Sequence, residues 1–160
     1  MGELLRSHLP ADDPVAPYAD RLVSQGLGGQ PLRGYLSGSI DVVLRLPRQR
    51  YLVIDYKTNY LGDTAAEYSP DRLREAMLHS DYPLQALLYV AVLHRFLRWR
   101  QPDYDPAQHL GGVLYLFVRG MCGPSTPEIN GHPCGVFGWA PPVDLMVALS
   151  DLLDEGRSAA

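Results

Sequence analysis

The sequence predicts an α/β domain with one mixed sheet, because strand, strand, helix, strand and helix signals follow one another along the chain. Two neighbouring segments alternate apolar and polar residues, as half-buried strands do. A long apolar segment with helical length follows them, and then a glycine-led apolar run typical of a core strand. The length of 160 residues fits one domain.

A β-hairpin is the clearest predicted element, with strands at residues 35–46 and 51–57. Apolar side chains alternate at positions 40, 42, 44 and 46, and again at 52, 54 and 56. Residues 47–50 form the turn between them. If Leu46 faces Arg50 across a three-residue turn, the numbers of paired residues sum to 96. Asp41 and Asp55 are then directly opposed.

The remaining elements are predicted from periodicity and from glycine and proline positions. Residues 4–9 end a helix, 10–17 form a loop, and 18–25 form a short helix. Beyond the hairpin we expect a loop at 58–70, helices at 71–79 and 83–99, a core strand at 111–118, a long loop at 119–142 and a helix at 143–155. Residues 1–34 are interpreted as a partial helical segment and 35–157 as the core, a fragment of a larger protein.

Composition excludes several classes of protein. The formal net charge of −4 argues against a protein that coats nucleic acid through a basic surface. No apolar run approaches the ~18 residues of a membrane span, so no membrane contact is expected. Two cysteines cannot form a disulfide framework, which favours a reducing cytoplasm.

A single lysine stands out among the basic residues. Lysine and arginine together number 14, and Lys57 is the one lysine. A lysine ammonium is compact and flexible, and burial can move its pKa, whereas a guanidinium is planar and permanently charged. Lys57 therefore marks a place where the two cations are not interchangeable, unless its position is chance.

Asp41 and Asp55 each interrupt an apolar strand, which is unusual because an unpaired buried carboxylate is costly. In the predicted register their Cβ atoms lie roughly 4.5–5.5 Å apart. Lys57 projects from the same strand face as Asp55. Two carboxylates beside an amine suit Mg²⁺ and the hydrolysis of phosphodiesters. The alternative is an ordinary Asp–Lys ion pair and one exposed aspartate.

Gln85 and Tyr89 are the next candidate pair. They lie four residues apart, so they share one face of the predicted helix. An amide and a hydroxyl at this spacing suit contact with a nucleic-acid backbone or base. The alternative is that both are hydrogen-bonded core residues.

Taken together, these motifs resemble the C-terminal nuclease domain of the RecB family, within the PD-(D/E)xK superfamily. The resemblance covers roughly residues 34–121 and the final helix. It rests on four segments in order: Gly38-x-Ile40-Asp41, Asp55-Tyr56-Lys57-x-Asn59, Gln85-x-x-x-Tyr89 and Gly111-Gly112-x-x-Tyr115-Leu116-Phe117-x-Arg119-Gly120. It implies a restriction-endonuclease-like mixed sheet flanked by helices.

The resemblance also implies residue roles. Asp41 and Asp55 match metal-binding aspartates, with the Tyr56 backbone carbonyl as a further Mg²⁺ ligand, and Lys57 matches the catalytic lysine. The helical glutamine and tyrosine match a motif that positions DNA. The implied protein is a magnesium-dependent exodeoxyribonuclease within a bacterial cytoplasmic helicase–nuclease. It would act in recombinational repair of double-strand breaks, with RecC and RecD as partners.

One family feature has no match here. Domains of this type carry a metal-binding histidine in a Gly-x-x-Leu-His context well before the hairpin. His8 follows Arg6 and Ser7 and lacks that context, so we expect the chain to lack this ligand and to cut DNA weakly or not at all alone. The competing interpretation is a non-catalytic docking or regulatory module that keeps a nuclease fold.

Overall fold

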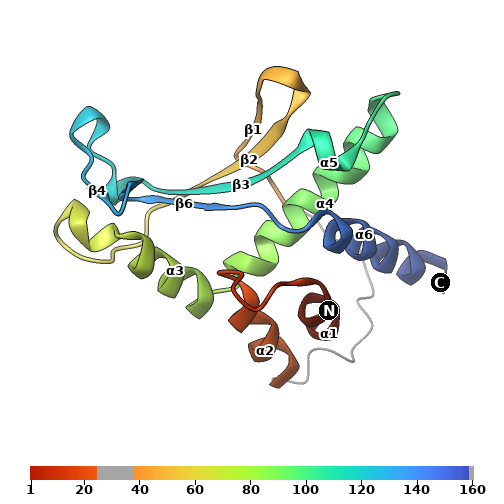
Figure 1. Cartoon of the computed structure of the whole chain (residues 1–160), viewed down its shortest axis with the longest axis horizontal. Coiled ribbons are helices and arrows are strands. Elements are labelled where there is room, and N and C mark those ends of the chain that lie inside the picture. Colours follow the sequence, from red (N-terminus) through yellow and green to blue (C-terminus); the bar gives the residue numbers. More distant parts are fainter. Residues whose placement is uncertain (25–37, 159–160) are drawn as a thin grey trace.

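A four-stranded mixed sheet organises the computed structural model, which describes residues 1–24 and 38–158. Its strands are β1 (Val42–Arg45), β2 (Tyr51–Lys57), β3 (Leu110–Phe117) and β6 (Val136–Trp139), in the order β1-β2-β3-β6. The β2–β3 pair is parallel, and the two outer pairs are antiparallel. The predicted α/β class and mixed sheet are confirmed (Figure 1).

The hairpin has the predicted register. Val42 pairs with Ile54 and Arg45 with Tyr51, so paired numbers sum to 96. The first strand is shorter than predicted, because it begins at Val42, and residues 35–37 lie outside the described part of the chain. In a continued ladder the N–H of Tyr56 would bond the main chain of β1, but here it donates to Asp41 Oδ2 at 3.0 Å. This side-chain bond replaces a rung of the ladder.

Six α-helices lie in the described residues: α1 (Gly2–His8), α2 (Ala16–Ser24), α3 (Pro70–His79), α4 (Tyr82–Arg100), α5 (Pro106–His109) and α6 (Val143–Ser158). The helices expected at 71–79, 83–99 and 143–155 are confirmed to within a few residues. Helix α2 begins inside the segment predicted as a loop. No helix in the described ranges is both long and apolar enough to cross a membrane.

The segment 119–142 was predicted as a loop, and this prediction is wrong in part. It contains β6 and a small hairpin of β4 (Glu128–Ile129) with β5 (His132–Pro133). Strand β6 has four residues after a stretch rich in glycine and proline, whose local preference is for turns. Its partner β3 supplies the main-chain hydrogen bonds that make it a strand.

The core lies between the sheet and the helices. Figure 1 shows α3, α4 and α6 along one side of the sheet, and the strand residues facing that side include the buried Val53 and Tyr115. Leu5 of α1 and Tyr18 of α2 belong to the same hydrophobic core. The predicted boundary between residues 34 and 35 lies outside the described residues.

Candidate active site

Asp55 and Lys57 lie on the helix-covered face of β2, near its C-terminal end. Their residues are 4% and 9% exposed, and Lys57 Nζ lies 2.6 Å from Asp55 Oδ2. Alternation along the strand puts both side chains on one face, with Tyr56 on the other. The pair is therefore a buried ion pair, which needs further polar contacts to offset its desolvation.

Helix α4 supplies those contacts through Gln85. The Lys57 ammonium donates to Gln85 Oε1 at 3.0 Å, and Gln85 Nε2 donates to the Tyr89 hydroxyl at 2.9 Å. The Tyr89 hydroxyl in turn donates to the Ser39 carbonyl at 2.7 Å. The chain of bonds thus runs from β2 through α4 to the segment just before β1. The structure brings Gln85 and Tyr89 to Lys57.

Asp41 lies beside this cluster, immediately before β1. It is exposed, and its Oδ2 accepts the Tyr56 N–H. Partial burial raises the pKa of the Tyr89 hydroxyl. The negative charges of Asp55 and then Asp41 raise this pKa further. The Tyr89 hydroxyl therefore lies within electrostatic reach of the two carboxylates.

Two tyrosines to which the sequence assigned no role in the site complete the surroundings of Lys57. Its Nζ lies 3.9 Å from the ring centroid of Tyr82 and 5.1 Å from that of Tyr115. The available signals were weak: Tyr82 precedes Gln85 by one helical turn, and Tyr115 stands in the core strand. Only the parallel β2–β3 pairing places Tyr115 opposite Asp55. Burial, and then the charge of Asp55, raise the pKa of the Tyr115 hydroxyl.

One observation tests whether these residues fit a divalent cation. Asp55 Oδ2 is buried and already lies 2.6 Å from the Lys57 ammonium, so the fit rests on the number of carboxylates and not on a vacant oxygen. With Asp41 nearby, two carboxylates match the one or two that Mg²⁺ commonly takes from a protein. The described residues hold no group of three or more His, Cys, Asp or Glu suited to a metal.

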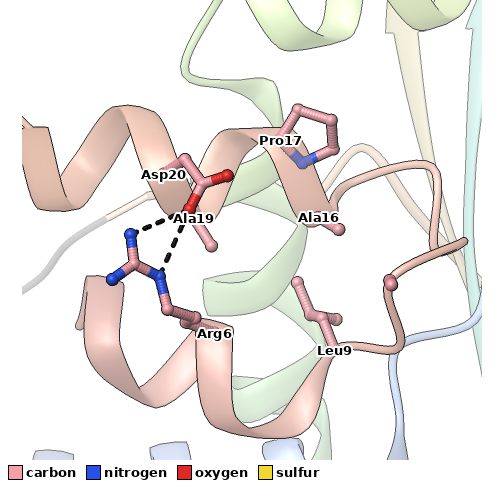
Figure 2. Close-up of a pocket in the computed structure, with 7 residues that line it drawn as sticks. Arg6, Leu9, Ala16, Pro17, Ala19 and Asp20 are labelled. Atoms are coloured by element: carbon pink, nitrogen blue, oxygen red, sulfur yellow. Dashed lines mark hydrogen bonds and ion pairs between the residues drawn. The ribbon is translucent and has the colours of Figure 1, made fainter.

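A separate cavity lies between α1 and α2 and is shown in Figure 2. It measures about 350 Å³, and Leu9 and Pro17 are among its lining residues. Its charged side chains are already paired, since Arg6 contacts Asp20 at 2.8 Å. None of its lining residues belongs to the cluster around Lys57, and it presents no reactive group.

Comparison with known proteins decides the family. The RecBCD enzyme subunit RecB of Mycobacterium tuberculosis (strain H37Rv) is 79% identical over 157 residues, which are 98% of this chain. The same subunit of Mycolicibacterium smegmatis is 66% identical over 159 residues, and that of Escherichia coli is 42% identical over 124 residues, or 71% of this chain. The chain belongs to the RecB family.

The chain corresponds to a limited part of a RecB subunit. It spans 14% of the length of the M. tuberculosis protein, 15% of the M. smegmatis protein and 10% of the E. coli protein. No family model matches it. The likeness to RecB from E. coli covers more than two thirds of the chain, so the shared region is larger than the hairpin and α4 alone.

Proposed function

We propose that this RecB-family chain is a metal-dependent DNA nuclease domain of the PD-(D/E)xK type, which hydrolyses phosphodiester bonds as a magnesium-dependent exodeoxyribonuclease. The main support is the buried ion pair of Asp55 and Lys57 together with a second carboxylate, that of Asp41, which accepts the neighbouring Tyr56 N–H. A pair that only stabilised the fold would need no second carboxylate beside it, because like charges repel unless a cation lies between them.

Each residue has a defined role in this proposal. Asp41, Asp55 and the Tyr56 carbonyl would hold Mg²⁺, which would supply activation of a water molecule and offset the negative charge that develops on the phosphate. The Lys57 ammonium orients the attacking water, and only after it has given up a proton can its neutral amine accept the proton that this water loses. Gln85 holds the Lys57 ammonium in place, and Tyr89 with Gln85 meets the DNA backbone.

The relatives suggest the larger context. In these relatives, RecB is named as a subunit of the RecBCD enzyme. By extension we propose that the chain works with RecC and RecD in a bacterial cytoplasmic helicase–nuclease, in recombinational repair of double-strand breaks. The motor and partner subunits would hold the DNA, which makes a net charge of −4 on this domain tolerable.

The test uses the natural protein, at the length that its gene encodes, with end-labelled single-stranded DNA. We expect Mg²⁺-dependent release of nucleotides, and a loss of at least ~100-fold in Asp55→Asn, which keeps the side-chain shape but removes the charge. Asp144→Asn, at an exposed position in the first turn of α6, is the matched control and should cut normally. If Asp55→Asn also cuts normally, or if no metal supports cleavage, the domain is instead a docking or regulatory module.

A further inference from the structure

The Lys57 ammonium lies against two aromatic rings, here called the tyrosine pair (Tyr82 and Tyr115). Tyr82 is the nearer, with its ring centroid 3.9 Å from Nζ, and the two rings stack with centroids 5.8 Å apart and planes inclined at 28°. An ammonium over the face of such a ring is attracted by its quadrupole, more strongly where water is excluded. Lys57 is 9% exposed, so the attraction acts in a largely dry place.

Both rings are held at their hydroxyl ends. The Tyr82 hydroxyl donates to Asn59 Oδ1 at 3.0 Å. The Tyr115 hydroxyl lies 3.1 Å from both the Tyr82 carbonyl and Gln85 Oε1, either of which can accept its single proton. The rings are therefore fixed relative to the start of α4, which also carries the amide that binds Lys57.

Four groups crowd the ammonium. Asp55 lies at 2.6 Å and Gln85 Oε1 at 3.0 Å from Nζ, and the ring centroids of the tyrosine pair lie at 3.9 and 5.1 Å. A lysine side chain has four rotatable bonds and would otherwise sample many positions. The rings limit Nζ to one place beside Asp55 without adding a second counter-charge, which a carboxylate in their position would do.

We propose that Tyr82 and Tyr115 are positioning residues that fix the Lys57 ammonium for the reaction. This inference rests on the proposed nuclease function only for its effect on rate, because the placement of Lys57 is a property of the folded chain. It predicts that the ring of Tyr82 matters more than its hydroxyl, because the contacts of the ring with Tyr115 and Lys57 persist without the bond to Asn59. Tyr82→Phe should therefore keep Lys57 in place, and Tyr82→Leu should not.

The placement is tested by NMR on the 160-residue chain, in which Lys57 is the one lysine. Selective ¹³C labelling of lysine therefore gives signals from this side chain alone. Protons over an aromatic face resonate upfield, so the Cε protons of Lys57 should be shifted upfield of those in the unfolded chain. Tyr82→Phe should keep the shift and Tyr82→Leu should reduce it. An unshifted resonance in the folded chain overturns the proposal.

A matched control separates placement from general loss of packing. Tyr104 is also half-buried and stacks on a neighbouring ring, that of His109, but it does not contact Lys57. Tyr104→Leu should therefore leave the Lys57 resonance where it is. If Tyr104→Leu moves this resonance as far as Tyr82→Leu does, the shift reports global packing and the proposal fails.

The effect on rate is measured in the natural protein with the same three variants. We expect Tyr82→Leu to lower kcat by ~10- to 100-fold with little change in KM, since misplacing a group by about 1 Å costs up to ~100-fold. Tyr82→Phe should stay close to wild type. If Tyr82→Phe loses as much as Tyr82→Leu, the hydroxyl bond to Asn59 is what counts, and the positioning role is wrong.

The proposed function and the positioning role can be disproved independently of each other. If the wild-type protein cuts no DNA with any metal, the proposed nuclease function is wrong. The NMR resonance of Lys57 then remains the test of where its ammonium is held. A wild-type protein that cuts DNA, with a Tyr82→Leu variant that cuts equally well, keeps the proposed function and overturns the positioning role.

Discussion

A buried lysine in an arginine-rich chain is the residue-scale feature that links sequence to chemistry. Lys57 reaches an oxygen of Asp55, an amide oxygen and two aromatic rings from a position that is 9% exposed. A guanidinium is larger and planar, so it does not fit the same set of contacts. The choice of lysine at this position therefore has a steric reason as well as a chemical one.

Lys57→Arg is expected to lower DNA cleavage by at least ~100-fold, the lower range for loss of a positioned acid–base group. It should also lower the free energy of unfolding by about 1–3 kcal/mol, because the larger head group crowds the tyrosine pair. Nuclease assays on the natural protein and urea unfolding of the 160-residue chain measure the two effects. Near-normal cleavage would show that Lys57 is only an ion-pair partner of Asp55.

His94 gives a second prediction at the residue scale. His94 is 3% exposed, and its Nδ1 lies 2.8 Å from the Tyr104 hydroxyl. Burial, and then the positive charge of Arg98, lower the pKa of His94, while Asp151 opposes them. In the unfolded chain a histidine has a pKa of about 6.5. Below that pH the unfolded chain therefore takes up a proton at His94 that the folded chain does not.

The free energy of unfolding should therefore fall as the pH is lowered through about 6.5, down to the lower pKa of the folded state. Urea unfolding at pH 7 and at pH 5.5 measures the fall. His94→Gln removes the titrating group, so the fall should be smaller in that variant. An equal fall in both proteins would assign the pH dependence to other groups.

At the scale of the element, a β-bulge in β3 shifts the register of its pairing with β2. Tyr51 pairs with Leu110 and Val53 with Val113, so one residue of β2 stands opposite two residues of β3. Gly112 lies in this bulge with φ of +92°, and a Cβ there would approach the Trp139 carbonyl oxygen to 2.4 Å. A glycine is required for both the backbone angle and the close approach of β6.

Gly112→Ala is expected to lower the free energy of unfolding by about 2–4 kcal/mol, from backbone strain and overpacking together. The urea midpoint of the 160-residue chain measures the change. Gly131→Ala is the matched control, because Gly131 has φ of +77° but open space around its Cβ position. It should show only the smaller strain cost. Equal losses would mean that contact with β6 contributes nothing.

At the scale of the whole molecule, the metal ligands are few for the chemistry proposed. The described residues offer two carboxylates and no larger metal-binding group of His, Cys, Asp or Glu. With few protein ligands a cation stays mobile, and a ~1 Å displacement can cost on the order of 100-fold in rate. The chain also has a net charge of −4, which does not steer DNA towards it.

We expect the 160-residue chain to fold, to bind Mg²⁺ weakly and to cut DNA poorly or not at all, and a natural protein that supplies the histidine ligand to bind and cut better. Calorimetric titration with Mg²⁺ and the nuclease assay compare the two proteins. The expectation is wrong if the 160-residue chain degrades DNA as fast as the natural protein, in a way that Asp55→Asn abolishes.

Local sequence determined the hairpin register and the extents of α3, α4 and α6. A three-residue turn allows one alignment of its strands, and a side-chain period of two or 3.6 identifies a strand or a helix from neighbours alone. The opposition of residues near Asp41 and Asp55 follows from that register. The pairing of Gln85 with Tyr89 on one face likewise follows from helical spacing.

Only the tertiary structure decided what surrounds Lys57. The parallel pairing of β2 with β3 brings Tyr115 next to Asp55 from 60 residues away, and the packing of α4 on the sheet brings Tyr82 and Gln85 to the ammonium. The same long-range pairing turns the four residues of β6 into a strand. The periodicity of one segment does not identify the segment that it will pack against. Each of these segments is stabilised by burial against the other rather than by local preference.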